Sequence, residues 1–139
     1  MLLHIVARGR IGTGPEAELV ARYLKRIAWP TRVSELPEVG GKLPARHGAR
    51  LVVLDEKGES QTSTGLAHCL GRWRDDGVRE TQFLIGAADG FDDAARAEAN
   101  VLLSFGRATW PHLLARAMLA EQLWRATSIL AGHPYHREG

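Results

Sequence analysis

The sequence contains a single cysteine, Cys69, among its 139 residues. An intramolecular disulfide and any zinc or iron–sulfur site built from several cysteines are therefore excluded. Long apolar runs are absent as well, because no stretch approaches the roughly 20 apolar residues that a membrane-spanning helix needs. The opening segment Met1–Ala7 is too short and too weakly flanked for a signal peptide. We therefore expect a soluble cytoplasmic protein that does not enter a membrane.

An excess of one charge sign is also missing, since 18 Lys and Arg stand against 16 Asp and Glu, for a net charge of +2. A nucleic-acid surface needs clustered cations rather than a large total. The segment Lys42–Arg50 carries three of these cations and no acid, but an ordinary solvated face explains this patch more simply. The hydrophobic content of 45% is enough for the core of one domain of this length.

Hydrophobic periodicity predicts strands that alternate with helices. Short apolar runs predict strands at Leu2–Ala7, Arg32–Leu36, Arg50–Leu54, Thr81–Ile85 and Val101–Ser104. Apolar residues at helical spacing predict four helices. They begin at Pro15, after a cap at Ser63 or Thr64, at Asp92 and at Pro111. The last helix is predicted to continue to Leu130, with Gly132 as its C-cap. Segment 37–48 is predicted to be a loop, and segment 55–60 the polar exit of the strand before it. The alternation predicts an α/β fold, a mostly parallel sheet with helices on both faces.

The loops that follow the strands indicate where a ligand would bind. In parallel α/β sheets, ligands bind outside the carboxyl ends of the strands. Three predicted loops fall there, after Leu54, after Ile85 and after Ser104. The second of them reads GAADG from Gly86 to Gly90, which would let the backbone approach a ligand closely, although a plain strand-to-helix turn explains it equally well.

Other motifs leave their interpretation open. His133 and His136 flank a proline, but no cysteine or carboxylate cluster nearby favours a metal site. Ser104 and Ser128 have no arrangement of His and Asp in the sequence that supports a hydrolytic triad. Segment 133–139 combines Pro, Tyr, His and Arg, side chains that stack on bases and neutralise phosphates, and an ordinary polar terminus is an equally good interpretation.

Five segments, in this order, carry a resemblance that covers essentially the whole chain. They are 54–58 (LDEKG), 83–90 (FLIGAADG), 109–112 (TWPH), 120–126 (AEQLWRA) and 134–137 (PYHR). Each is weak alone, but together they resemble the SPOUT superfamily of RNA methyltransferases, in particular its members that modify ribosomal large-subunit RNA. The sequence departs from that pattern at Ala87, which replaces a glycine, at Arg107, which is unusual in its loop, and in segment 37–48, which is shorter.

The resemblance implies a homodimer with the SPOUT α/β knot, a feature that periodicity does not reveal. It implies methyl transfer from S-adenosyl-L-methionine to N3 of a pseudouridine in 23S rRNA within the assembled ribosome, without a metal. The positions that match the cofactor-binding residues of the family are Leu54, Gly86, Phe105, Gly106, Arg107, Ala108, Thr109 and Trp110.

Methyl transfer from a sulfonium group requires alignment of the reactants and removal of the N3 proton. We expect the tail residues Tyr135, His136 and Arg137 to act on the substrate, with His136 or His112 as the base and Arg137 or Arg125 as phosphate or oxyanion ligand. Two alternatives are another SPOUT RNA methyltransferase with a different target nucleotide and a non-catalytic RNA- or nucleotide-binding module on the ribosome. Apolar residues on more than one face of the helix from Pro111 to Leu130 favour a two-fold dimer around it.

Overall fold

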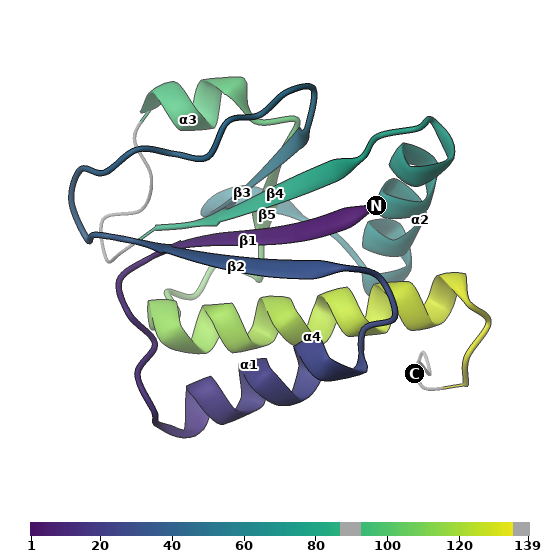
Figure 1. The fold of residues 1–139 in the computed structure, drawn as a ribbon, viewed down its shortest axis with the longest axis horizontal. Coiled ribbons are helices and arrows are strands. Elements are labelled where there is room, and N and C mark those ends of the chain that lie inside the picture. The colour runs from purple at the N-terminus through teal and green to yellow at the C-terminus, as the bar shows by residue number, and fades with distance from the viewer. Residues whose placement is uncertain (87–92, 135–139) are drawn as a thin grey trace.

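Strands and helices alternate along the chain, as the periodicity predicts (Figure 1). The computed structural model describes residues 1–86 and 93–134. In chain order the elements are β1 (Leu2–Arg8), α1 (Pro15–Arg26), β2 (Thr31–Leu36), β3 (Arg50–Ser60), α2 (Ser63–Asp75), β4 (Glu80–Ile85), α3 (Asp93–Glu98), β5 (Val101–Ser104) and α4 (His112–Leu130). Within the described residues, no helix is both long and apolar enough to cross a membrane.

The five strands form one parallel sheet in the order β2-β1-β4-β3-β5. The central strands β1 and β4 are buried along most of their length, which agrees with their nearly continuous apolar sequences. The prediction of a mostly parallel α/β sheet is therefore confirmed. The knot that the resemblance implies stays a prediction.

Helices cover the two faces of the sheet unequally (Figure 1). On one face α4 packs against both α1 and α2, and the core there includes Phe83 of β4 and Leu119 of α4, neither of which is exposed. On the other face Ala95 of α3 joins Val53 and Leu84 of the sheet. The prediction of helices on both faces is confirmed.

Two predicted helix caps are each displaced in the structure. Thr62 caps α2, because its Oγ1 accepts a hydrogen bond from the Gly65 N–H at 2.9 Å, whereas Ser63 or Thr64 was the predicted cap. At the end of α4 the C-cap is Ala131 rather than Gly132. Gly132 follows with a φ of 72°, the left-handed conformation that glycine adopts just beyond a helix.

The prediction that segment 55–60 is a polar exit was wrong, because β3 continues through it to Ser60. Leu103 of β5 pairs with both Leu54 and Glu59, so the residues between these two bulge out of the ladder. Gly58 makes the bulge possible, because a Cβ at this position would lie 2.5 Å from the carbonyl oxygen of Leu102. Main-chain pairing with β5, which no side-chain pattern predicts, holds this polar segment in the strand.

A chain of buried and half-buried polar side chains links β1, β2 and β4. The imidazole of His4 is buried, with Nδ1 2.9 Å from Glu80 Oε2 and Nε2 2.7 Å from Ser34 Oγ. Gln82 Nε2 donates to the same Glu80 oxygen and to the carbonyl oxygen of Ala45, each at 3.0 Å, and so ties segment 37–48 to the sheet. Burial raises the pKa of Glu80, but the hydrogen bonds from His4 and Gln82 and nearby positive charge lower that pKa overall.

We expect Glu80→Ala to lower the free energy of unfolding by about 1.5–3 kcal/mol near pH 7, because it removes an ionised acceptor from His4 and Gln82. The lowered pKa of Glu80 means that the carboxylate stabilises the fold above its unfolded-state pKa and that this contribution is lost as the pH falls through the folded-state pKa. Urea unfolding should show the difference from wild type shrinking at acidic pH. Glu18→Ala, at an exposed position of α1, is the control and should change stability by less than about 0.5 kcal/mol. Equal losses in both variants, independent of pH, would contradict this account.

Candidate active site

The carboxyl ends of β3, β4 and β5 lie together at one edge of the sheet. Leu54 of β3 pairs with Leu103 of β5, and the residue before Leu54 pairs with Leu84 of β4. Gly86 directly follows β4, and the loop Phe105–Trp110 directly follows β5. The predicted loop after Leu54 is instead the bulged part of β3, and this bulge, Gly86 and the loop after β5 lie at the edge where ligands of parallel sheets bind.

Hydrogen bonds fix the loop after β5 against the bulged part of β3. Ser104 Oγ donates to the carbonyl oxygen of Glu56 at 3.1 Å and accepts from the Gly106 N–H at 3.1 Å. Thr109 Oγ1 donates to Glu56 Oε2 at 2.9 Å. Gly106 has a φ of 107°, which favours glycine in this tight turn. The loop is thus held at both ends to the same residue of β3.

The eight predicted cofactor positions differ in burial. Gly86 is buried, Leu54, Phe105 and Gly106 are half-buried, and residues 107–110 are exposed. Trp110 is 43% exposed although its Nε1 donates to the carbonyl oxygen of Phe105 at 3.3 Å. The edge therefore has a more buried part that includes Leu54 and Phe105, and an exposed rim of mixed polarity at residues 107–110. Residues 87–90, the rest of the predicted glycine-containing turn, lie outside the described residues.

The predicted catalytic residues Tyr135, His136 and Arg137 also lie outside the described residues. The described chain ends at Pro134, just beyond α4. The 19 residues of α4 span about 28 Å at 1.5 Å per residue. Because α4 begins beside the loop after β5, the tail starts at the opposite end of this helix from that loop.

A buried arginine to which the sequence analysis gave no role joins α4 to the strand ends. The Arg116 side chain is 1% exposed and is the largest of the fully buried side chains among the described residues. Its Nη1 donates to Glu35 Oε2 at 2.6 Å, and its Nη2 donates to the carbonyl oxygen of Gly9 at 3.1 Å. The same oxygen of Glu35 accepts from the Ile11 N–H at 2.8 Å. The one signal in the sequence is that Arg116 interrupts the apolar residues of α4.

The carboxylate of Glu35 is held in its ionised form. Burial raises its pKa, but hydrogen bonds from Arg116 and Ile11, together with the charges of Arg116 and Arg10, lower the pKa overall. Gly9 and Ile11 both belong to the connection between β1 and α1. The ion pair therefore locks this connection and the end of β2 to α4.

The structure does not gather the other candidate groups into a site. Among the described residues there is no group of three His, Cys, Asp or Glu side chains placed to hold a metal. Cys69 is buried, and burial raises the pKa of its thiol. Ser128 is buried within α4, and the Arg125 Nε donates to Glu121 Oε1 at 2.8 Å on the same helix. Arg125 thus makes an ion pair within α4, and the hydroxyl of Ser104 is engaged by backbone groups.

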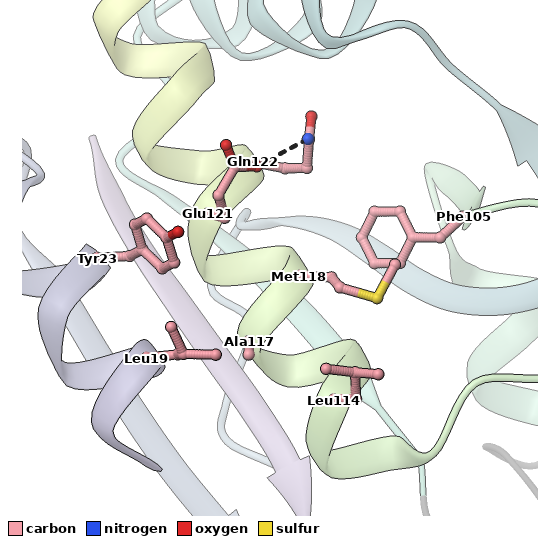
Figure 2. A pocket seen from close by; sticks show the side chains of 8 residues that line it. All are labelled: Leu19, Tyr23, Phe105, Leu114, Ala117, Met118, Glu121 and Gln122. Atoms are coloured by element: carbon pink, nitrogen blue, oxygen red, sulfur yellow. Dashed lines mark hydrogen bonds between the residues drawn. The ribbon is translucent and has the colours of Figure 1, made fainter. Parts of the chain in front are cut away.

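An apolar groove lies between α1 and α4 beside Phe105 (Figure 2). Leu19 and Tyr23 reach it from α1, and Leu114 and Met118 reach it from α4. Its volume is about 250 Å³. The apolar surface of α4 that exceeds what the sheet covers is therefore divided among contacts with α1, contacts with α2 and this open groove.

Comparison with known proteins identifies the family. A profile of the family described as "Predicted SPOUT methyltransferase" matches residues 1–136. The ribosomal RNA large subunit methyltransferase H of Rhizorhabdus wittichii is 75% identical over 140 residues, and that of Novosphingobium aromaticivorans is 66% identical over 141 residues. Both matches cover 100% of this chain and 100% of the relative.

A solved structure shares the fold at much lower identity. The probable methylase family protein from Haemophilus influenzae matches with a TM-score of 0.64 at 8% identity, over 99% of this chain and 70% of that one. That likeness shows the fold alone, whereas the family profile and the full-length relatives confirm the resemblance of the five sequence segments. The chain belongs to the SPOUT methyltransferase family, within the group of the ribosomal RNA large subunit methyltransferases H.

Proposed function

We propose that this methyltransferase acts in the cytoplasm and moves a methyl group from S-adenosyl-L-methionine to N3 of a pseudouridine in 23S rRNA within the assembled ribosome. The observation that carries the proposal is the identity of 75%, over the full length, to a protein named ribosomal RNA large subunit methyltransferase H. That name supports large-subunit rRNA as the substrate. The pseudouridine and the cofactor rest on the resemblance of the sequence segments. A purely non-catalytic module is not supported, because the relatives are named methyltransferases.

The residues at the ends of β3, β4 and β5 fit S-adenosyl-L-methionine. Adenosine groups bind in clefts that are mostly apolar, where a few backbone groups fix their orientation. Leu54 and Phe105 supply half-buried apolar surface, and the buried Gly86 presents backbone without a Cβ. These residues and Gly106 would hold the adenosine, with the exposed Arg107, Ala108, Thr109 and Trp110 at the rim.

Methyl transfer mainly requires that the methyl group and the accepting nitrogen are aligned. When bound, the cofactor supplies a methyl group that is already activated, so no metal is required. The loop after β5 is fixed by the hydrogen bonds of Ser104 and Thr109, which supports an orientation set before the substrate arrives. A base must also take the N3 proton, and imidazole titrates in the range that suits this task near neutral pH.

The α1–α4 groove offers an interface for the homodimer that the family resemblance implies. Leu114, Met118 and Tyr23 line it, and each is only partly buried (Figure 2). A second copy related by a two-fold axis would cover the same patch on both subunits. Burial of this apolar surface would stabilise the pair by about 25 cal/mol for each Å² removed from water.

A dimer also explains how the tail, residues 135–139, could reach a cofactor-binding edge. From Pro134 to Arg137 the chain can extend by about 10 Å, at no more than about 3.6 Å per residue. That reach is far shorter than the length of about 28 Å by which α4 separates the tail from the loop after β5 in its own subunit. We therefore infer that Tyr135, His136 and Arg137 act at the cofactor edge of the partner subunit, where the ring stacks on a base and the guanidinium holds phosphate.

The proposed reaction predicts the loss of one modification when the protein is absent. Mass spectrometry of 23S rRNA from cells that lack this protein should show one methylpseudouridine reduced to pseudouridine, and the wild-type gene should restore it. Loss of a methyl group from a different nucleotide would support another RNA target instead. An unchanged methylation pattern would refute the proposed function.

Gly86→Val should abolish binding of S-adenosyl-L-methionine, because a branched side chain would occupy buried space beside the strand ends. Gly86→Ala, which adds one carbon, should show an intermediate loss. Calorimetry measures the affinity, and circular dichroism checks that both variants are folded. Unchanged affinity in Gly86→Val would show that the cofactor binds elsewhere.

Deletion of residues 135–139 should leave cofactor binding intact and lower methyl transfer at least about tenfold, which corresponds to about 1.4 kcal/mol of lost transition-state stabilisation. Mixed with the Gly86→Val variant, the deletion variant should regain about a quarter of the wild-type sites, because half of the dimers are mixed and each of these pairs one intact pocket with one intact tail. Sedimentation of the wild type should give twice the chain mass of 15.3 kDa. Full activity of the deletion variant, or no recovery in mixtures shown to exchange subunits, would contradict the role of the tail.

A further inference from the structure

A second hollow opens at the carboxyl edge of the sheet, over the ends of β1 and β2. Its volume is about 590 Å³, and it is lined by Gly9, Arg10, Glu35, Leu36, Pro37 and Glu38. None of these residues belongs to the predicted cofactor positions. The hollow is large enough for a nucleobase and lies where parallel sheets bind ligands.

The hollow adjoins the cofactor edge. Ala7 of β1 pairs with Ile85 of β4, so the next residues, Arg8 and Gly86, follow at neighbouring positions about 5 Å apart. The chain connections switch faces between these two strands. The helix after β1, α1, lies on one face of the sheet, and the helix after β4, α3, lies on the other. Such a reversal of connection creates a crevice between neighbouring strand ends.

Two proton-accepting side chains, Glu38 from the lining of the hollow and His112 from α4, lie near Gly9. A Cβ built on Gly9 would lie 3.8 Å from Glu38 Oε1 and 3.9 Å from His112 Nε2. Gly9 carries no side chain, so no Cβ occupies the position beside these two groups, and its φ of 84° favours glycine here. His112 is the first residue of α4, and only Pro111 separates it from the loop Phe105–Trp110.

The walls of the hollow are fixed by internal bonds. Glu35 is committed to Arg116 and to the Ile11 N–H, which leaves Glu38 as the carboxylate available to a ligand. Arg8 Nη1 donates to the carbonyl oxygens of Pro37 and Gly40, at 3.0 and 2.6 Å, and so anchors the turn that carries Glu38 from both sides. The hollow is therefore a built site rather than a gap between loose segments.

We propose that this hollow binds the acceptor base, with N3 of its imide edge facing His112 Nε2 and with Glu38 lining the hollow beside the ring. The inference rests on the proposed function and names the subsite within it. An imide edge presents one N–H donor between two carbonyl oxygens, so it needs an acceptor flanked by donors. His112 Nε2 takes the proton of N3: the N–H bond breaks, its electron pair stays on N3 as the nucleophile, and the imidazole becomes protonated. Arg10 supplies positive charge near the oxygens on which the negative charge of the base spreads.

A thiol block tests the location of the subsite. Cys69 is buried, so a small charged methanethiosulfonate reagent should modify Glu38→Cys selectively. Modification should lower methyl transfer to ribosomes at least about tenfold relative to the same variant before labelling, with unchanged affinity for S-adenosyl-L-methionine. Val39→Cys is the matched control, because the Val39 side chain is the immediate neighbour and is 88% exposed, and its modification should have no effect.

Full activity of labelled Glu38→Cys, or equal inhibition of labelled Val39→Cys, would overturn the proposed subsite. Neither result would contradict the proposed function as long as the unlabelled protein transfers methyl groups. Failure of the unlabelled wild type to bind S-adenosyl-L-methionine would instead refute the function and leave the subsite without a reaction.

Chemical rescue tests the role of His112. His112→Ala should lower the rate at saturating ribosomes about 100-fold, and added imidazole should restore part of that rate. The exposed His68 of α2 provides the control, since His68→Ala should retain the wild-type rate. Cofactor affinity and the urea midpoint of unfolding show whether the variant is intact. A wild-type rate in His112→Ala, or a loss in an intact variant that imidazole does not relieve, would overturn the assigned proton transfer.

Discussion

The buried guanidinium of Arg116 constrains the geometry of the whole carboxyl edge. A charge that is 1% exposed costs several kcal/mol unless it is paired and hydrogen-bonded. The partners here are Glu35 at the end of β2 and the carbonyl oxygen of Gly9 after β1. Displacement of α4, of the β1–α1 connection or of β2 would leave the charge without compensation. Three segments far apart in the sequence are therefore held in one arrangement.

This arrangement also sets the position of the His112 side chain at the strand ends. His112 lies one helical turn before Arg116 and so projects from the same side of α4. The pairing of Arg116 with Gly9 thus accounts for the position of the His112 imidazole over that glycine. On the other side of His112, the loop after β5 is fixed to Glu56 of β3. The first turn of α4 therefore stands between the loop after β5 and the hollow over Gly9.

Elements with a clear local sequence pattern were predicted well, whereas features that depend on contacts between distant residues were not. The strands β1, β4 and β5 were predicted within one residue at each end, because short apolar runs bounded by polar residues reflect burial on both faces. The extension of β3 to Ser60 was not predicted, because main-chain pairing with β5 holds its polar residues. Arg116 and Glu35 were missed for a similar reason: nothing in a single sequence links two residues separated by 81 positions.

The sequence by itself determined the alternation of strands and helices, the parallel sheet and the resemblance to the SPOUT family, because periodicity and ordered motifs are local properties. It also indicated the edge at which we expect a ligand to bind, since the loops after parallel strands meet there. Only the tertiary structure decided which side chains face one another at that edge. The Arg116 ion pair, the contact of His112 with Gly9 and the bulge at Gly58 each join residues from distant parts of the chain. Such contacts depend on how the helices pack against the sheet, and packing is set by the whole core rather than by any one segment.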